Sequence, residues 1–366
     1  MRILASFTIA VACLAPLRPA AADGSLGTAG PFRAIGGATC AGGYIAQMQG
    51  KCDPPPVDQS LSPAARSQAE VERALKLIAL IRLEQAKQAL DAAIALDPRN
   101  VAAYKLRARM AIPGSLASAE VDVNAGLLLA PSDSDLLATR ALLLRNQQDT
   151  DCTCMERAKR DADDAIKANP KNADAFWIRA QIFRDLGKMD AAEADLSQSL
   201  VLEPNHTRAR MLRAQIRMMM DRAKEAADDA SVVLEQNPAD ISALQLRAVV
   251  RAQFGDLAGA IDDLGAILGE PGKVTNITPA AAMFGDLYLQ RAILLVAVGR
   301  PDDAMRDLDS IVTIGGPQAL LRLQVYLRGH GFPDVAIDGR RSESFDDAIK
   351  ACFVDKACGH GLVRRS

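Results

Sequence analysis

The stretch ADAFWIRAQIFRDLGKMDAAEADLSQSLVLEPN, residues 173–205, predicts two short amphipathic helices joined by a tight turn. Phe176 and Ala180 lie four residues apart, so they share one face of the first helix. Gly187 permits the turn, and Pro204 ends the second helix because proline cannot continue one. One such pair cannot bury its apolar face alone, so the stretch predicts one unit of a stacked array.

The same features recur along the chain at a nearly constant interval. An Arg-Ala dipeptide returns after 34, 33, 39, 34, 34 and 44 residues. Its arginines are Arg73, Arg107, Arg140, Arg179, Arg213, Arg247 and Arg291. A marker alanine recurs with the same six intervals, at Ala86, Ala119, Ala158, Ala192, Ala226, Ala260 and Ala304. This period predicts about seven stacked repeats, which occupy residues 64–318.

An aspartate follows the marker alanine by three residues in every unit except the first, where Ala89 stands instead. These aspartates are Asp122, Asp161, Asp195, Asp229, Asp263 and Asp307. Their fixed offset from the repeated arginines predicts ion pairs between helices of the same unit or of adjacent units. Paired carboxylates for acid–base chemistry are the competing interpretation. A feature present in nearly every unit favours the scaffold.

Composition supports a helical array and narrows the functional classes. Hydrophobic residues make up 49% of the chain but aromatic residues only 4%, which suits an Ala- and Leu-rich core between close helices. The net charge of −2 gives no field for steering nucleic acid, so we expect no nucleic-acid partner. No nucleophile–base pair or metal-ligand spacing emerges, and we expect no catalysis, no metal and no other cofactor. The three scattered histidines are His206, His330 and His360.

Residues 173–205 resemble the tetratricopeptide repeat in their order of large and small side chains. The match includes Ala180, Gly187, Ala192 and Pro204, whereas Ser199 stands where the repeat usually has alanine. The other six units resemble the repeat more weakly, and together they cover about two-thirds of the chain. The resemblance implies an all-α fold, a right-handed α-solenoid with a concave groove that holds a peptide or a protein.

The first helix of each unit lines the groove in this family. Transferred to this chain, the groove positions are Lys105, Arg109, Arg145, Trp177, Gln181, Arg184, Arg208, Met211, Gln215, Met218 and Gln245. They form a moderately basic face that contains methionines and the only tryptophan of the chain. Because arginine forks bind carboxylates well, this face predicts an acidic peptide or a C-terminal carboxylate as its ligand.

The N-terminus has the features of a secretory signal peptide over residues 1–22. A positive start precedes an apolar run at residues 3–14 and a small-residue site at residues 20–22. No later stretch reaches the roughly 18 apolar residues of a transmembrane helix, so we expect no stable membrane insertion. Residues 23–63 are rich in glycine and proline and predict a flexible arm. We therefore expect a periplasmic or secreted protein.

Six of the seven cysteines lie beyond the predicted signal peptide, and an even number in an exported chain predicts disulfides. Sequence proximity favours Cys40–Cys52, Cys152–Cys154 and Cys352–Cys358, although other pairings stay open. A metal site is the alternative. It is disfavoured because one residue between Cys152 and Cys154 is too short a spacing for a usual pair of zinc ligands.

Residues 319–366 break the period and predict a small helical module. They resemble the peptidoglycan-binding domain of wall hydrolases at Leu323, Gln324, Leu327, Gly331, Asp338, Gly339, Ala348 and Ile349. Ser342, Phe345 and the pair Cys352-Phe353 depart from that pattern. Two interpretations stay open. The module binds peptidoglycan, or it caps the last apolar face of the array, as terminal repeats require.

Together these features predict an exported scaffold or adaptor that mediates protein–protein interaction at the cell envelope, without catalysis. The expected partner is a protein or peptide in the concave groove. The alternative is a peptidoglycan-binding envelope protein that recruits partners through its repeats.

Overall fold

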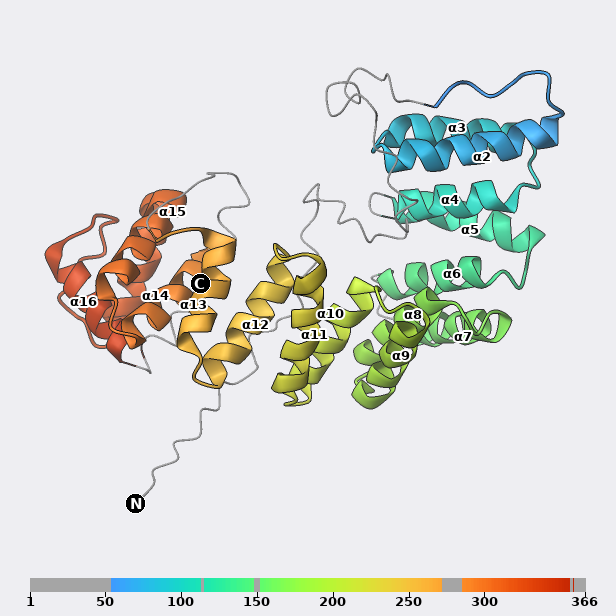
Figure 1. The fold of residues 1–366 in the computed structure, drawn as a ribbon. Coiled ribbons are helices and arrows are strands. Elements are labelled where there is room, and N and C mark those ends of the chain that lie inside the picture. Colours follow the sequence, from blue (N-terminus) through green and yellow to red (C-terminus); the bar gives the residue numbers. More distant parts are fainter. Residues whose placement is uncertain (1–53, 113–114, 148–151, 272–284, 356–357, 359–366) are drawn as a thin grey trace. The chain divides into compact units, whose positions relative to one another are not determined.

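The computed structural model describes residues 54–112, 115–147, 152–271, 285–355 and 358 of the 366-residue chain. These residues form fifteen helices and no strand, which confirms the predicted all-α repeat fold (Figure 1). The chain divides into two compact units. The described parts of these are residues 54–216, here called the first unit, and residues 217–355 with 358, the second unit.

Helices of the first unit pack in consecutive antiparallel pairs. α2 packs on α3, α4 on α5, α6 on α7 and α8 on α9. The first helix of each pair also contacts the first helix of the next, because α2 touches α4, α4 touches α6 and α6 touches α8. The helices are α2 (Pro63–Ala79), α3 (Leu83–Leu96), α4 (Val101–Ala111), α5 (Leu116–Leu129), α6 (Ser134–Asn146), α7 (Cys152–Ala168), α8 (Ala173–Asp185), α9 (Met189–Leu202) and the start of α10 (Thr207–Met219).

The second unit continues the same helix order and ends in the C-terminal segment. α15 is broken at Gly316, which has a positive φ of 58° and is followed by Pro317. The helix therefore has two parts. The predicted end of the array at residue 318 falls at this break. The helices are the end of α10, α11 (Ala223–Gln236), α12 (Ile241–Gln253), α13 (Leu257–Leu268), α14 (Gly285–Ala297), α15 (Pro301–Gly329) and α16 (Glu343–Val354).

In five helix pairs the described turn between the two helices contains a residue in the left-handed region. Gly187, Gly255 and Gly299 hold this position, with φ between 72° and 86°. The first pair places Ile81 there, with a φ of 60° and a side chain that is 64% exposed. A β-branched side chain is strained in this conformation because its Cβ crowds the backbone. Asp221 holds the same position between α10 and α11, with a φ of 59°. Ile81 is therefore the β-branched residue at a turn position where the other described pairs have glycine or aspartate.

Replacement of Ile81 by glycine is expected to stabilise the protein. The left-handed conformation costs a non-glycine residue about 1–2 kcal/mol, and the greater freedom of glycine in the unfolded chain offsets part of this gain. We expect I81G to raise the free energy of unfolding by about 1 kcal/mol in urea denaturation. The reciprocal variant G187A should lower it, and a loss of stability in I81G would contradict the assignment of strain.

The predicted arginine–aspartate pairs connect the two helices of a pair. In each, the arginine Nε and Nη2 donate to the two carboxylate oxygens over 2.6–3.0 Å. The pairs are Arg107–Asp122, Arg140–Asp161, Arg179–Asp195, Arg247–Asp263 and Arg291–Asp307. Arg107 and Arg179 also reach Asp91 and Asp163 of the preceding pair. The prediction is confirmed for these five pairs, which link helices within and between repeats.

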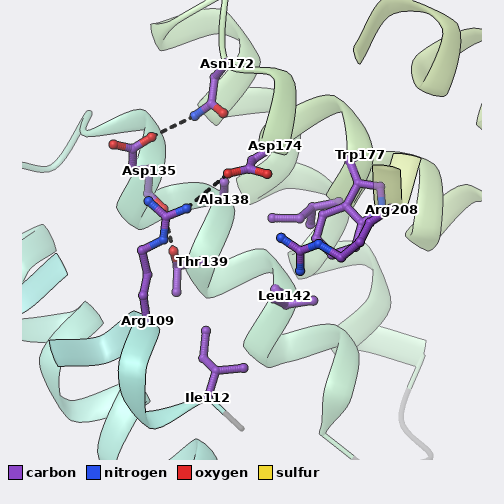
Figure 2. Close-up of a pocket in the computed structure, with 11 residues that line it drawn as sticks. Arg109, Ile112, Asp135, Ala138, Thr139, Leu142, Asn172, Asp174, Trp177 and Arg208 are labelled. Atoms are coloured by element: carbon purple, nitrogen blue, oxygen red, sulfur yellow. Dashed lines mark hydrogen bonds and ion pairs between the residues drawn. The ribbon is translucent and has the colours of Figure 1, made fainter. Parts of the chain in front are cut away.

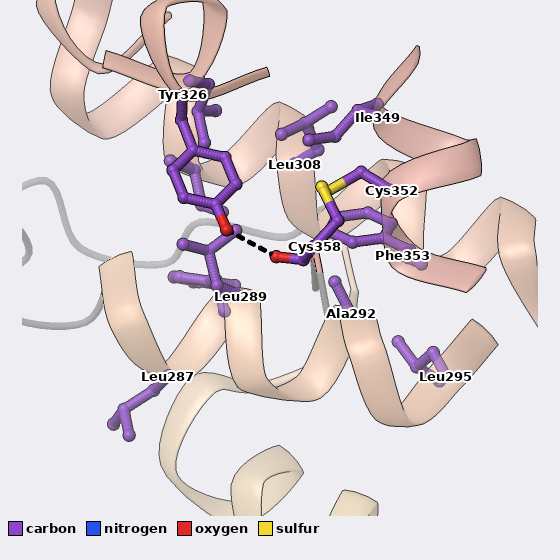
Figure 3. Close-up of a cluster of buried hydrophobic side chains, with 14 of the residues drawn as sticks. Leu287, Leu289, Ala292, Leu295, Leu308, Tyr326, Ile349, Cys352, Phe353 and Cys358 are labelled. Atoms are coloured by element: carbon purple, nitrogen blue, oxygen red, sulfur yellow. Dashed lines mark hydrogen bonds between the residues drawn. A yellow bond between two sulfur atoms is a disulfide. The ribbon is translucent and has the colours of Figure 1, made fainter. Parts of the chain in front are cut away.

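The C-terminal segment shares one hydrophobic core with the last repeats. This core runs from Ala248 of α12 to Cys358 and includes Leu289, Leu295 and Phe345 (Figure 3). The Tyr326 hydroxyl lies in the same core and donates to the Cys358 carbonyl over 2.7 Å. Such packing fits the capping interpretation, because the segment covers apolar faces of α14 and α15.

Gln324 holds the loop that carries residues shared with the peptidoglycan-binding pattern. Its side chain is fully buried, and its Oε1 accepts from the backbone N–H groups of Asp338 and Gly339 at 3.2 and 2.9 Å. Its Nε2 donates to the Arg340 carbonyl over 2.7 Å. Gln324, Asp338 and Gly339 therefore have a structural role in fixing this loop against α15.

The predicted bridge Cys352–Cys358 is confirmed and closes a short loop in this core. Replacement of both cysteines by alanine should lower the free energy of unfolding by about 2 kcal/mol, because a short cross-link removes little chain entropy from the unfolded state. Urea denaturation of the oxidised protein gives the comparison. The single variant C154A is the control, and an equal loss in both would contradict the prediction.

The predicted bridge Cys152–Cys154 is wrong, because Cys154 is a free thiol. Both residues lie in the first turn of α7. Positions two apart on a helix do not share a face, so this spacing does not favour a bridge. The Cys154 thiol instead lies 4.0 Å from Gln147 Oε1.

Several predictions concern residues that the structure does not describe. The signal peptide, most of the predicted arm, and the pair Cys40–Cys52 lie outside the described residues. Among the helices that are described, none combines the length and apolar character needed to cross a membrane.

Candidate functional site

A pocket of about 160 Å³ lies where the first helices of consecutive repeats meet (Figure 2). Its lining comes from α4, α6 and α8, from their ends, and from the first turn of α10. The lining residues are Arg109, Ile112, Asp135, Ala138, Thr139, Leu142, Asn172, Asp174, Trp177, Ile178 and Arg208. Three of these residues, Arg109, Trp177 and Arg208, are among the groove positions predicted from the sequence.

Asn172 fixes the start of α8 against α6. Its Oδ1 accepts from the Ala175 N–H over 3.1 Å, which caps the helix. Its Nδ2 donates to Ser134 Oγ over 2.8 Å and to Asp135 Oδ1 over 3.0 Å. Because both contacts are on α6, the first turn of α8 is held in place at the edge of the pocket.

His206 has the same capping role for α10. It follows the cap residues Asn100, Asp133 and Asn172 at the repeat interval, and Asp240 continues the series. The Ala209 N–H donates to His206 Nδ1 over 3.2 Å, so the proton of the neutral ring is assigned to Nε2. This Nε2 lies 3.2 Å from Asp174 Oδ1. His206 thus connects the start of α10 to Asp174 in the pocket.

Asp174 is the shared partner of a histidine and an arginine. Arg109 Nη2 approaches Asp174 Oδ2 at 3.1 Å and links α4 to α8. Burial opposes ionisation of the Asp174 carboxyl. The hydrogen bond from His206 and the charge of Arg109 outweigh this effect and lower the pKa of Asp174 below its ordinary value. The ionised carboxylate of Asp174 therefore links α4 and the start of α10 to α8 beside the pocket.

Arg208 stacks on Trp177 and keeps hydrogen-bonding capacity. Its guanidinium carbon lies 4.5 Å from the centre of the Trp177 ring, a cation–π arrangement. Its Nε is buried and has no hydrogen-bond partner among the described residues. Burial lowers the pKa of Arg208, and the nearby charge of Arg109 acts in the same direction. The charges of Asp174 and Glu203 act in the opposite direction. The guanidinium is therefore desolvated and lies near acidic residues, but it forms no ion pair of the kind that Arg107, Arg140 and Arg179 form.

The structure pairs most of the cations that the sequence predicts for the groove. Lys105 lies 3.1 Å from Asp133 and 2.6 Å from Asp135. Arg145 and Arg184 both contact Asp185. Of the five predicted groove cations, only Arg208 has no hydrogen bond or ion pair within the described part of the chain. The predicted basic face is therefore largely neutralised.

The other predicted groove positions fall into three groups. Trp177 lines the pocket, whereas Met211, Gln215 and Gln245 are half-buried outside its lining.

Gln181 and Met218 are only 8% and 5% exposed, so little of either side chain is available to a ligand. Each lies one helical turn after a core residue, Ile178 and Ala214 respectively, which puts it on a packed side of its helix.

Sequence analysis missed the apolar lining residues Ile112, Ala138, Leu142 and Ile178, and the polar residues in and beside the pocket. Asp135, Asn172, Asp174 and His206 were not predicted as site residues. The repeat alignment contained a signal for two of them, because Asn172 and His206 both occupy the helix-capping position. The contact of Arg109 with Asp174 spans 65 residues and had no such signal.

The lowered pKa of Asp174 predicts an acid-sensitive contribution to stability. A carboxyl with a depressed folded pKa stabilises the fold above its unfolded pKa, about 3.9, and loses this effect as the pH falls through the folded value. We expect D174N to cost about 1 kcal/mol near neutral pH and less near about pH 3. Urea denaturation at both pH values measures this. The exposed Asp190 supplies the control D190N, and a D174N effect that does not narrow in acid would contradict the prediction.

Comparison with known proteins supports the repeat assignment. Residues 155–205 and 183–241 match the tetratricopeptide repeat. PilF of Pseudomonas aeruginosa is 16% identical and similar with a TM-score of 0.50, covering 63% of this chain and 99% of that one. At this identity the likeness shows the fold alone. No curated protein matches the chain.

Two further solved structures are similar to parts of the chain. A thermophilic tetratricopeptide protein of Thermus thermophilus is 25% identical, with a TM-score of 0.45, covering 51% of this chain and 98% of that one. A tetratricopeptide repeat protein of Parabacteroides merdae is 20% identical, with a TM-score of 0.43, covering 69% of this chain and 94% of that one. From the helix pairs described above, the chain is an all-α protein of repeated helix pairs, and its residues 155–241 are similar to the tetratricopeptide repeat.

Proposed function

We propose that this protein is an exported scaffold whose repeats bind a partner protein or peptide, with a carboxylate of the partner against Arg208. Stacked first helices offer an extended surface that suits a peptide or a protein. One observation supports the proposal that a carboxylate of the partner binds at Arg208. Of the two pocket arginines, Arg109 is paired with Asp174, whereas Arg208 stacks on Trp177 with an unpartnered Nε. A guanidinium in this state favours a carboxylate partner.

The test first selects peptides that bind the protein and then measures how R208Q changes their affinity. A library of random heptapeptides is selected on the whole protein, and the affinity of each enriched peptide is measured through Trp177, the only tryptophan. Because a hydrogen bond to a charged group contributes about 1.5–3 kcal/mol, R208Q should weaken binding by about tenfold to a hundredfold. Arg210 lies on the same helix but does not line the pocket, so R210Q is the matched control. Equal effects of the two variants would contradict the proposal.

Export rests on the N-terminal sequence and on cysteine chemistry. Residues 1–22 have a positive start, an apolar run and a small-residue site. The Cys352–Cys358 bridge is consistent with an oxidising compartment. Cell fractionation with mass measurement of the mature chain tests this part. A cytoplasmic protein that retains residues 1–22 would contradict export without affecting the proposed peptide site.

Peptidoglycan binding at the cell envelope is the second candidate. The observation in its favour is that Gln324, Asp338 and Gly339, all part of the peptidoglycan-binding pattern, are joined by hydrogen bonds. Co-sedimentation of the whole protein with purified sacculi is the test. Retention that D338A abolishes would support this role. A protein that stays in the supernatant would leave the C-terminal segment with its capping role alone.

A further inference from the structure

The cap of α10 is a side chain that can change its charge near neutral pH. His206 caps this helix, whereas Asn100 and Asn172 cap α4 and α8 through a side-chain oxygen. An amide oxygen accepts hydrogen bonds at any pH. Histidine, in contrast, is the side chain that ordinarily changes its charge between about pH 5 and 8. The start of α10 therefore depends on an acceptor that a mild change in pH can remove.

Both ring nitrogens of His206 are engaged, and their roles are opposite. Nδ1 accepts the Ala209 N–H over 3.2 Å, and Nε2 lies 3.2 Å from Asp174 Oδ1. The side chain of His206 is only 6% exposed. A neutral imidazole has one donor and one acceptor nitrogen, but a protonated imidazole has two donors. Protonation would therefore keep the contact with Asp174 and place a second hydrogen against the Ala209 N–H, where no cap can form.

Charged residues of four helices surround the ring and act on it in both directions. They are Asp174 of α8, Arg109 of α4, Glu203 after α9, and Arg208 and Arg210 of α10. Burial opposes ionisation of Asp174, but the hydrogen bond from His206 and the charge of Arg109 keep its pKa below the ordinary value. Asp174 is therefore a carboxylate throughout the range in which a histidine changes its charge. It holds a protonated ring in place, while the arginines repel the new charge.

We propose that His206 is a pH-sensitive cap, whose protonation opens the first turn of α10 and releases Arg208 from Trp177. Arg208 is the second residue of α10, and its guanidinium carbon lies 4.5 Å from the centre of the Trp177 ring (Figure 2). The centre of the His206 ring lies 5.7 Å from the same aromatic ring. A protonated His206 would thus repel the guanidinium beside it and at the same time remove the hydrogen bond that fixes its turn.

The test measures hydrogen exchange of the Ala209 amide, with the Ala175 amide as an internal reference. The Ala175 N–H donates to Asn172 over 3.1 Å, so it holds the same position in the preceding repeat with a cap that does not titrate. NMR of the ¹⁵N-labelled whole protein gives the protection of both amides at about pH 7.5 and about pH 5. The protection of Ala209 relative to Ala175 should fall about fivefold in acid, as expected for the loss of one N-cap.

The variant H206N separates the histidine from a general effect of acid. Asparagine is the cap that the repeat uses at Asn100 and Asn172, so H206N keeps an acceptor and removes the titration. The ratio of the two protection values should then be the same at both pH values. His330 of the second unit supplies the matched control H330N, which should behave as the unchanged protein does. Circular dichroism confirms that both variants are folded.

A second readout shows whether the cap and the arginine respond together. The Ala209 amide signal, the indole N–H signal of Trp177 and the ring signals of His206 should shift with one common midpoint. This result, with a fall of the protection ratio that H206N alone abolishes, would support the proposal. A ratio that stays constant in acid, an equal fall in H206N, or different midpoints would overturn it. The test needs no ligand, so its failure would leave the proposed peptide site intact.

Discussion

Replacement of Arg291 by methionine is expected to lower the free energy of unfolding by about 3–5 kcal/mol. The side chains of Arg291 and Asp307 are 1% and 0% exposed and share two hydrogen bonds. Arg291 Nη1 also donates to the Gly269 carbonyl. Removal of the arginine leaves a buried carboxylate without its counter-charge, which costs far more than the loss of an exposed ion pair. Urea denaturation followed by circular dichroism measures the change.

The repeat itself supplies a matched control at Arg247. This arginine forms the same two-hydrogen-bond contact with Asp263, but its side chain is 22% exposed. Asp263 also keeps Arg251 as a second partner at 2.9 Å. R247M should therefore cost about 1 kcal/mol. The double variant R291M/D307A should recover much of the loss of R291M, because it leaves no buried charge. Equal costs for R291M and R247M would contradict this account.

The period of the sequence was sufficient to predict the helix pairs and their ion pairs. Six of the seven units contain the arginine and the aspartate, which lie 16 residues apart in four of these units, and helix geometry converts this offset into contacts such as Arg179–Asp195. Local signals of this kind act within one or two helices. They recur in most units, so errors in a single unit, such as Ala89 in the first, do not obscure the pattern.

The pocket was harder to predict because its contacts are not periodic. Arg109 meets Asp174 two repeats later, and Lys105 meets Asp133 and Asp135 of the next repeat. A list of first-helix positions identifies the cations but not the carboxylates that neutralise them. Arg208 can be identified as the predicted groove cation without an ion pair among the described residues only when all the other ion pairs are known. The number of basic residues along a groove therefore overstates the charge available to a ligand.

Replacement of Phe345 by alanine is expected to cost about 3–5 kcal/mol and to loosen the last repeat. Phe345 is fully buried near the start of α16, within the core that includes Leu289 and Leu295 of α14. Its loss leaves a cavity that the neighbouring helices fill only in part. Urea denaturation gives the stability change, and hydrogen exchange of the α14 amides shows where the structure opens.

The exchange data decide whether the C-terminal segment is a cap or an independent domain. A cap supports the repeat that it covers, so F345A should accelerate exchange in both α14 and α16, because α16 packs on α14 and α15. The control V354A changes an α16 side chain that is 72% exposed and should alter stability by less than about 0.5 kcal/mol. Faster exchange in α16 with α14 unchanged would contradict capping. In that case the apolar contacts between the segment and the last repeat contribute little to the stability of α14.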